Sequence, residues 1–598
     1  MATERPSQPS SPAPGRAARH PSERLIWVAL VATLGLAVGA GLTASNWLWG
    51  VNTLHHWPPG GAVLLAALGL LGFVGPARHS IAPALDRIGS RWDRAGLAGD
   101  LKAMAPVVLV LLVLRDPLRF TGDSLTRAGW VSETLSASEL TLAYPLDVWV
   151  NARVARALAH AGLGPMTALQ VVGALMGGCF ALVGFRFLRA AGARRGLLPA
   201  GAIALLGGST LAHFAGYDKF GPLMVGLALA ATGAVHMAAR GRGTWTLVMG
   251  VVVTVLSHRS GFLLLPAAAW LLSRAYRAGD ARARRRILLG SLVVALAVLP
   301  VFGRTVDTYL HYDRVVHLPG GTVAESRLDR PIVANLVHRV ADGLNALFFL
   351  VPLWLVGAAA RVMLRARGDS ASAARRHSRL GLAAGLALAG FAVVLFGVEP
   401  GGGWARDWDV ATGASTLVAM VSTYALVGAW RRGTDTLAPA VTVALSMTVA
   451  AWGIHSSERI GLARVAALLE ARPALSDPIR AGICDFRGVR ALNGRRFDEA
   501  APWFERSIQV GGPNPRVVYE AGLAYFRGGK LAAARAAFTR AASLSRSLST
   551  PYVWLTRIAL ADRDTATAIA MLDSSLARHP ASVEIRRWER ALRAARAP

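Results

Sequence analysis

Residues 220–259 read FGPLMVGLALAATGAVHMAARGRGTWTLVMGVVVTVLSHR, and they contain two apolar runs joined by a short basic connection. The runs at 220–239 and 243–257 have no charged residue, whereas the connection holds Arg240 and Arg242. A helix rises about 1.5 Å per residue, so about 20 apolar residues cross a hydrocarbon layer of about 30 Å. The segment therefore predicts two helices that cross a membrane and turn at arginines.

The same pattern continues along most of the 598-residue chain. Hydrophobic residues make up 53% of the chain and charged residues 17%, whereas an ordinary soluble domain has about 25% charged residues. The mean hydropathy is +0.41. These values predict an all-α, polytopic membrane protein with about thirteen transmembrane helices. The predicted spans are 25–44, 61–77, 103–114, 166–188, 197–214, 220–239, 243–257, 260–273, 287–303, 346–363, 380–397, 412–430 and 436–455.

Arginine clusters fall in every second connection between these spans. Cytoplasmic connections carry the excess of Lys and Arg in membrane proteins. The N-terminus is therefore predicted to be cytoplasmic and the part after the last span extracytoplasmic, in a bacterial-type inner or plasma membrane. The clusters are Arg16–Arg24, Arg78–Lys102, Arg189–Arg195, Arg240–Arg242, Arg274–Arg286, Arg361–Arg379 and Arg431–Arg432.

The charge pattern and the cysteines exclude a nucleic-acid partner, a disulfide framework and a zinc site. The net charge is +30, but the arginines lie in short clusters between apolar runs, so we predict no nucleic-acid partner. The two cysteines, Cys179 and Cys484, lie far apart and exclude both a disulfide framework and a zinc site. Residues 1–24 are rich in Pro, Ser and Ala and predict a disordered cytoplasmic tail.

The seventh and eighth spans are separated only by Ser257-His258-Arg259-Ser260. If they formed one helix, Arg259 would lie in the middle of the membrane, at a cost of at least about 3 kcal/mol. The sequence therefore predicts a tight hairpin at this point.

The connections without arginine clusters carry polar motifs instead. The predicted topology places all of these motifs on the extracytoplasmic side, where they form the candidate functional site. They are Thr121-Gly122-Asp123-Ser124, Gly216-Tyr217-Asp218-Lys219, His258-Arg259, His338 with Asp342 and Asn345, and Arg406-Asp407-Trp408-Asp409.

Over residues 100–470 this layout resembles the GT-C superfamily of integral-membrane glycosyltransferases. The resemblance depends on the order of the motifs above, together with Tyr144-Pro145-Leu146-Asp147, Phe214-Ala215, Leu265-Pro266 and Pro352. In that superfamily the acidic loop usually follows the first span, whereas here it follows the third. The first two spans are therefore interpreted as an added N-terminal hairpin.

The resemblance implies an inverting glycosyltransferase that takes a sugar from a polyprenyl-phosphate donor and transfers it to a hydroxyl group of a protein or glycan. It places the site on the extracytoplasmic face. Membrane-spanning O-mannosyltransferases that carry lumenal tetratricopeptide repeats have a similar overall plan. Membrane lipids, the lipid-linked sugar and the acceptor are the partners that this reading implies.

Asp123 is the predicted general base. Sugar transfer to a hydroxyl requires a base near the acceptor oxygen, and Asp123 lies just past an apolar run, where partial desolvation favours that role. The alternative is that Asp123 caps a helix that starts near Ser124. Glu133 and Glu139 in the same loop are second choices, and loop acids of this kind are commonly just solvated.

Four basic residues are candidates for binding the donor phosphate: Arg406, Arg259, His258 and Lys219. Arginine suits phosphate because its planar guanidinium stays charged and donates two parallel hydrogen bonds. The alternative for each of them is that the side chain extends from the membrane edge to lipid headgroups.

The other predicted substrate-binding residues are Tyr217, Asp218, Asp407, Trp408, Asp409, His338 and Asn345. The sequence assigns no resident cofactor. Asp407 and Asp409 are candidates for a divalent cation such as Mg²⁺ or Mn²⁺, and a salt bridge with Arg406 in a belt of interfacial aromatic residues is the alternative. Tyr217 also suits such a belt, while His338 and Asn345 have the spacing to tie the outer loop to the tenth span.

The last part of the chain contains a repeat of 34 residues. This offset relates Gly488 to Gly522, and the third unit has Thr556 at the glycine position. The further positions are Ala500, Ala534 and Ala568, then Phe504, Phe538 and Leu572, then Ser507, Ala541 and Ser575, with Tyr525 and Pro580 at the aromatic and proline places. The period and the small residues match tetratricopeptide repeats, which stack helical hairpins into an α-solenoid.

The predicted domains are the tail at 1–24, the transmembrane transferase at 25–470 and an extracytoplasmic repeat domain at 471–598. Two other classes stay open. A transporter or lipid flippase would place ionisable residues near the middle of the bilayer. A membrane scaffold would use the repeats to recruit partners, and the spans would serve only as its anchor.

Overall fold

The protein is described here by a computed structural model. The structure describes residues 21–120, 131, 144–215, 220–313, 332–366, 371–398, 400, 403–545, 549–578 and 583–596. In this part of the chain the secondary structure is helical, apart from one isolated bridge between Ser45 and Arg472. The prediction of an all-α protein is therefore confirmed for the described residues.

The chain forms two compact units. The first, called the bundle, comprises residues 1–43, 48–399 and 408–461, and the second, called the hairpin stack, comprises residues 44–47, 400–407 and 462–598. In chain order the helices up to residue 456 are α1 (Pro21–Gly41), η1 (Asn46–Leu48), η2 (Asn52–His56), α2 (Pro59–Leu71), α3 (Gly75–Arg94), α4 (Gly96–Val113), α7 (Pro145–Val148), η3 (Trp149–Val154), α8 (Ala155–His160), α9 (Pro165–Ala190), α10 (Leu197–Leu206), α11 (Ala212–Ala215), α12 (Gly221–Arg240), α13 (Thr244–Ser257), η4 (Arg259–Leu264), α14 (Leu265–Ala278), α15 (Ala281–Thr308), η5 (Tyr309–Asp313), α17 (Ile332–Leu350), α18 (Trp354–Ala366), α19 (Ala371–Gly397), η7 (Trp408–Ala411), α20 (Thr412–Arg431) and α21 (Leu437–Ser456).

Several helices of the bundle are long and apolar enough to cross a membrane, as in a multi-pass membrane protein. Among the described residues there are 8 such helices, or up to 10 if two bent pairs each count as one span. Each predicted span falls on a helix, but α10, α13 and α14 have only 10 to 14 residues. A helix of 14 residues is about 21 Å long, shorter than the hydrocarbon layer, so the number of about thirteen spans stays a prediction.

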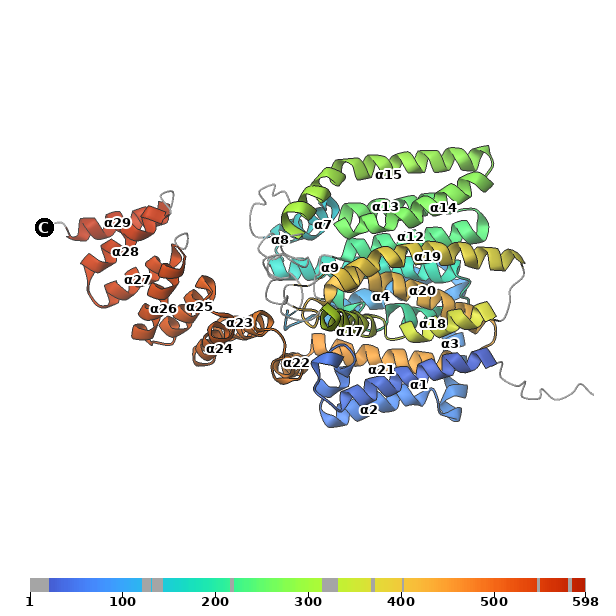
Figure 1. Cartoon of the computed structure of the whole chain (residues 1–598), viewed down its shortest axis with the longest axis horizontal. Helices are drawn as coiled ribbons and strands as arrows, with labels where there is room; N and C mark the ends of the chain where they lie inside the picture. The colour runs from blue at the N-terminus through green and yellow to red at the C-terminus, as the bar shows by residue number, and fades with distance from the viewer. Residues whose placement is uncertain are drawn as a thin grey trace, which may run out of the picture. The chain divides into compact units, whose positions relative to one another are not determined.

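Glycines bring neighbouring helices of the bundle close together, as in the antiparallel pair α12 and α13. A Cβ atom at Gly250 would lie 2.2 Å from the Ala230 nitrogen, and one at Gly233 would lie 2.3 Å from the Leu247 nitrogen. Small residues of this kind allow membrane helices to pack backbone against backbone. Figure 1 shows α12 and α13 side by side with α15, α19 and α20.

The predicted hairpin between the seventh and eighth spans is present. After α13 the chain turns at His258 into the 3₁₀ turn η4, where Gly261 lies so close to Thr254 that a Cβ atom would be 2.3 Å from its carbonyl oxygen. Helix α14 then runs back and contacts α13. Arg259 therefore lies in the turn and not within a continuous helix.

The predicted tenth span, 346–363, is divided between two helices. Helices α17 and α18 meet at an angle of 90°. Pro352 lies in the break, and proline ends a helix because it has no N–H to donate and its ring clashes with the preceding turn. The second span is interrupted in a similar way, since α2 and α3 are bent by 76° at residues 72–74.

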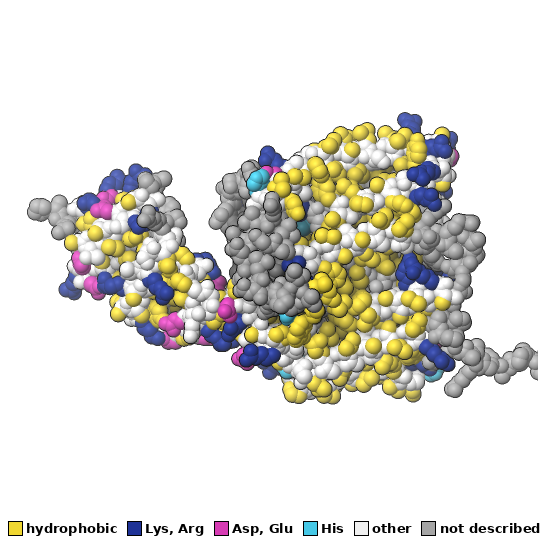
Figure 2. Space-filling model, in the orientation of Figure 1, with side chains coloured by type: hydrophobic (Ala, Val, Ile, Leu, Met, Phe, Trp, Pro, Cys, Tyr) yellow, Lys and Arg dark blue, Asp and Glu magenta, His cyan; other side chains and the backbone are white. Residues whose placement is uncertain are grey.

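Arginine clusters lie together at one end of the bundle. Arg189 pairs with Asp93 at 2.7 Å and with the fully buried Asp100 at 2.9 Å, and Arg78 pairs with Asp435 at 3.0 Å. These pairs join connections that are far apart in the sequence. Figure 2 shows Lys and Arg side chains gathered at this end of a largely apolar surface, which we call the arginine end.

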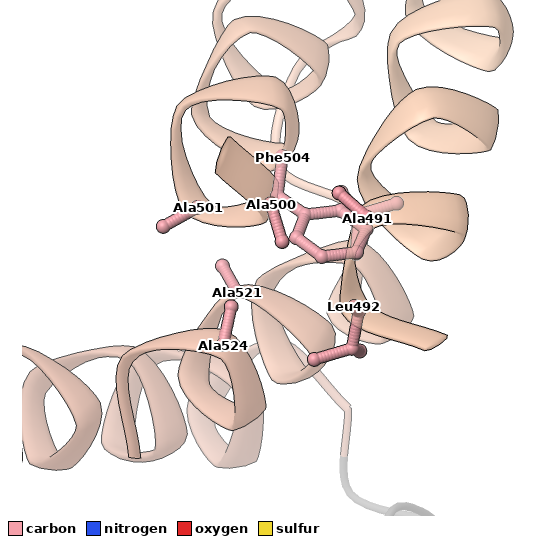
Figure 3. Close-up of a cluster of buried hydrophobic side chains, with 8 residues drawn as sticks. Ala491, Leu492, Ala500, Ala501, Phe504, Ala521 and Ala524 are labelled. Carbon is pink, nitrogen blue, oxygen red and sulfur yellow. The ribbon is translucent and has the colours of Figure 1, made fainter. Parts of the chain in front are cut away.

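The hairpin stack consists of helices that pack mainly on their neighbours in sequence. They are α22 (Glu458–Glu470, of which residues 462–470 belong to this unit), α23 (Asp477–Asn493), α24 (Phe497–Gly511), α25 (Pro515–Arg527), α26 (Leu531–Leu544), α27 (Thr550–Ala561), α28 (Thr565–Arg578) and α29 (Val583–Arg596). Figure 3 shows one of its buried clusters, formed by alanines around Phe504.

The 34-residue offset recurs in the packing of these helices. A Cβ atom at Gly488 would lie 2.6 Å from the Phe504 ring, and one at Gly522 would lie 2.6 Å from the Phe538 ring. In the third unit Thr556 and the smaller Leu572 occupy the same two positions, and both are fully buried. A smaller residue at the second position is compatible with a residue larger than glycine at the first.

Candidate functional site

The end of the bundle opposite the arginine end gathers aromatic and histidine side chains from separate helix ends and connections. The Trp408 ring of η7 lies 4.5 Å from His213 of α11, 5.1 Å from His455 of α21 and 5.2 Å from Phe349 of α17. All four side chains are buried. We call these four residues the aromatic–histidine cluster, and it is the core of the candidate site.

Thr412 holds one histidine of the cluster in place. The Thr412 hydroxyl donates to the Asp409 carbonyl oxygen, and its oxygen lies 2.5 Å from His213 Nε2. Because that hydroxyl proton is already donated, the oxygen is left to accept from Nε2–H. This arrangement favours the Nε2–H tautomer of His213.

Asp116 approaches the cluster from the start of the first large outer connection. Its carboxylate accepts the Leu118 N–H at 2.8 Å and the Arg119 N–H at 3.0 Å. Its other oxygen lies 3.9 Å from His455 Nδ1. Sequence analysis missed both Asp116 and His455. The signal that was available is position, because Asp116 follows the third apolar run directly and His455 ends the last one.

Of the predicted phosphate ligands, His258 belongs to the surroundings of the cluster. Its ring lies 5.0 Å from Phe220, and the Phe220 ring lies 6.5 Å from His213. His258 Nδ1 accepts the Ser260 N–H at 3.2 Å, which leaves Nε2 as the protonated nitrogen of the neutral ring. Arg259 follows as the half-buried first residue of η4.

The predicted residues on α17 are tied to the N-terminal hairpin. The Asn345 carboxamide oxygen accepts the Gly50 N–H at 3.0 Å, and Asp342 accepts the Trp49 indole N–H at 2.8 Å. A Cβ atom at Gly50 would lie 2.1 Å from the Asn345 carbonyl oxygen, so the approach depends on glycine. His338 lies half-buried two turns before Asn345 on the same helix. The N-terminal hairpin is thus packed into the bundle.

Asp147 is a further buried carboxylate in the described part of the outer connections. It is 1% exposed and accepts a hydrogen bond of 2.7 Å from the Asn151 amide. The chain then makes a π-helical turn at Trp149–Val154, a feature that is frequent at functional sites. The short helix α7 that carries Asp147 contacts α12 and α13. Sequence analysis quoted this residue within a motif but gave it no role.

The predicted Arg406-Asp407-Trp408-Asp409 motif is divided between the two units. Arg406 and Asp407 belong to the hairpin stack, where their N–H groups bond to the Gly403 carbonyl at 3.0 and 2.9 Å. Trp408 and Asp409 are buried in the bundle. No group of three His, Cys, Asp or Glu side chains that could hold a metal ion occurs among the residues described, including Asp407 and Asp409.

A buried arginine fixes the turn that precedes this motif within the hairpin stack. Arg464 is 2% exposed and donates to the Ala405 carbonyl oxygen at 3.1 Å. Burial lowers the pKa of Arg464 to about 10, so the guanidinium remains charged at neutral pH. The backbone next to Arg406 is therefore held by an internal charged donor.

Several predicted site residues lie outside the described residues. They are Asp123, Tyr217, Asp218 and Lys219, together with the second-choice acids Glu133 and Glu139. The flanking residues are described, since Phe120 is buried before the first of these segments and Phe220 is buried after the second.

No protein-family model matches this chain, and no curated protein matches it.

Proposed function

We propose that this chain is a membrane glycosyltransferase of the GT-C type, acting at the bundle end that holds the aromatic–histidine cluster. The single observation that carries the proposal is the convergence of polar and aromatic side chains from separate helix ends and connections at that end. His213 of α11, Phe349 of α17, Trp408 of η7 and His455 of α21 come from four different elements, and Asp116 comes from the connection after α4. A site assembled from many connections suits an enzyme that must hold two substrates in one orientation.

The chemistry assigns a role to each kind of residue. Transfer from a lipid phosphate to a hydroxyl needs a base at the acceptor oxygen and positive groups around the departing phosphate. In this proposal Asp123 is the base, and His258 with Arg259 and Lys219 hold the phosphate, whereas the fourth candidate, Arg406, belongs to the hairpin stack. The reaction inverts the sugar carbon, since the acceptor oxygen attacks as the polyprenyl phosphate leaves.

The placement of buried charges favours this proposal over a transporter. In the described bundle the buried acids are Glu23, Asp100, Asp116, Asp147 and Asp409, and all of them lie at or near helix ends. Transporters typically bind their substrates and ions near the middle of the bilayer, at broken helices. A site at one membrane face suits a lipid phosphate that lies at the headgroup level.

The proposal extends to topology and to the hairpin stack. The arginine end would face the cytoplasm, so the aromatic–histidine cluster and the stack would be extracytoplasmic. The stack would be a tetratricopeptide-repeat solenoid whose concave face holds a protein acceptor or a partner of the glycan pathway. An assembly surface unrelated to the substrate is the other reading of the same repeats.

The test is a transfer assay with the full-length protein in nanodiscs, using a radiolabelled polyprenyl-phosphate hexose and a membrane-protein extract as acceptor. Asp123→Asn is expected to lower transfer by about 10²-fold or more while donor binding is kept. Glu139→Gln in the same loop is the matched control and should transfer like the wild type. Unchanged transfer by a folded Asp123→Asn protein would remove Asp123 from the mechanism, and movement of the labelled lipid between leaflets without transfer would favour a flippase.

A further inference from the structure

A largely apolar cavity lies inside the bundle between α12, α14, α19 and α20. Its lining includes Leu227 and Val235 of α12, Ala268 of α14, Ala384 of α19 and Met420 of α20. Helix α14 contacts α19, and α12 contacts both α19 and α20, so these helices border a cavity that is partly open. The cavity is separate from the aromatic–histidine cluster, none of whose four residues belongs to its described lining.

One end of the cavity is basic. Among the described lining residues Arg361 alone carries a charge, and it lies within electrostatic reach of Tyr424, which also lines the cavity. Arg361 is followed one turn later on α18 by Arg365. Leu364, between them, packs on Gly428, three residues before Arg431 at the end of α20. The charged end of the cavity is therefore at the arginine end of the bundle.

A glycine makes room for the Arg361 guanidinium. A Cβ atom at Gly381 of α19 would lie 2.2 Å from Arg361 Nη2. The guanidinium thus lies against the α19 backbone, at the point where that helix borders the cavity. A methyl group at position 381 would displace this flexible side chain without disturbing a backbone contact, because the side-chain end is all that it meets.

The apolar part of the cavity has the length of a partial acyl chain. Along α20 the lining runs from Leu417 to Tyr424, and seven residues of helix correspond to about 10 Å. A cavity with apolar walls and one cationic end is complementary to an amphipathic anion. Arginine is well suited to phosphate, and a charge bordered by apolar walls is stabilised by an opposite charge.

We propose that this cavity binds an anionic phospholipid of the bilayer, with its phosphate at Arg361 and part of one acyl chain along α12, α14, α19 and α20. Arg365 adds positive charge near the headgroup. The phosphate lies at the arginine end, opposite the end where the glycosyltransferase proposal places the sugar donor. The lipid is therefore a resident ligand of the bundle and not the donor.

Native mass spectrometry of the full-length protein tests this site. The wild type is delipidated and then titrated with phosphatidylglycerol or with phosphatidylcholine of the same chains. It is expected to retain one phosphatidylglycerol at least tenfold more tightly than phosphatidylcholine. Arg361→Gln should remove most of that preference, whereas Arg282→Gln, on the exposed first turn of α15, should keep it.

Two further variants separate the headgroup from the chain. Gly381→Ala keeps the charge but displaces the guanidinium, so phosphatidylglycerol binding should weaken several-fold. Ala384→Phe fills the apolar part of the cavity and should weaken binding of both lipids. If Arg361→Gln does not fold, this variant tests whether the cavity binds the lipid. Equal retention of the two lipids by the wild type, or wild-type retention by folded Arg361→Gln or Ala384→Phe, overturns the proposal. Displacement of phosphatidylglycerol by polyprenyl phosphate would also overturn it, because it would give the cavity to the donor lipid.

Discussion

The bundle and the hairpin stack are held together in opposite ways. In the stack each helix packs mainly on the next one in the chain, and the same contact between a small residue and a larger one recurs at an offset of 34 residues. In the bundle the decisive contacts join distant segments, such as Thr412 with His213 at a separation of 199 residues and Trp49 with Asp342 at 293. A local change in the stack should therefore stay local, whereas a change in the bundle can disturb several connections at once.

The first test of this comparison is whether the hairpin stack is exposed outside the membrane while the bundle is embedded in it. If the stack is extracytoplasmic, protease added to intact spheroplasts should remove the chain after about residue 470 completely and leave the apolar bundle in the membrane. This is the largest expected effect, because it is all or none. An epitope at the C-terminus and another in the bundle would report the cleavage on immunoblots.

Inverted vesicles are the control for this experiment. Protection of the stack in spheroplasts, with cleavage only in inverted vesicles, would contradict the assignment of the arginine end to the cytoplasm. It would also move the aromatic–histidine cluster to the cytoplasmic face.

Asp100 and Asp116, near the two ends of α4, allow the two ends of the bundle to be compared with each other. Asp100 is fully buried and pairs with Arg189 at 2.9 Å, so it holds two connections together at the arginine end. Removing one partner of a buried pair costs about 3–5 kcal/mol, so Asp100→Asn should strongly destabilise the protein. Asp116→Asn keeps an oxygen that can accept the Leu118 N–H, so the free energy of unfolding should fall by about 1 kcal/mol or less.

The loss of transfer activity per folded molecule should follow the reverse order, with Asp116→Asn more affected than Asp100→Asn. Because Asp116 faces His455 at the candidate site, Asp116→Asn should lower transfer about tenfold in protein that remains folded, a change equivalent to about 1.4 kcal/mol. Thermal unfolding in detergent and transfer per folded molecule measure the two effects separately. Equal loss of stability in both variants, with normal transfer by Asp116→Asn, would assign Asp116 to the fold alone.

The same contrast explains how much could be predicted from the sequence. The positions of the helices follow from apolar runs and their basic connections, because both are local patterns. The 34-residue offset that relates Phe504 to Phe538 and Gly488 to Gly522 follows from spacing alone, and the structure adds that each glycine packs on the phenylalanine of its own unit. The contacts among His213, Trp408 and His455 could not be predicted in this way. They depend on how helix ends that are distant in the sequence pack together, and no periodic pattern in the sequence indicates that packing.

Local patterns also missed interruptions of helices and individual buried groups. Pro352 is itself the sequence signal for the break between α17 and α18. A search for apolar runs overlooks it, because the run 346–363 is apolar on both sides of the proline. Asp116 and Asp147 look like ordinary loop acids in the sequence. Their burial results from packing against residues elsewhere in the fold.

The most local effect belongs to the third repeat, where Thr556 and Leu572 replace the glycine and phenylalanine of the first two. Leu572→Phe alone would place a larger ring at the buried position that packs on glycine in the first two repeats, and such overpacking costs about 1–3 kcal/mol. Thr556→Gly alone removes a buried side chain that bonds to the Tyr552 carbonyl at 2.8 Å, and it adds a glycine to a helix, for a loss of about 1–2 kcal/mol.

The double variant Thr556→Gly with Leu572→Phe should recover part of both losses, because it recreates the glycine–phenylalanine contact seen at Gly488 and Phe504. Contacting residues are coupled by about 0.5–3 kcal/mol, so a coupling near 1 kcal/mol is expected. Hydrogen exchange of the α27 and α28 amides in the full chain measures it, since local opening reports the stability of these helices. The matched exchange in the second repeat, Gly522→Thr with Phe538→Leu, should show coupling of the same sign. Additive losses in both repeats would mean that the two residues of each pair do not compensate for each other's size, and the offset would then be a sequence pattern without a shared packing rule.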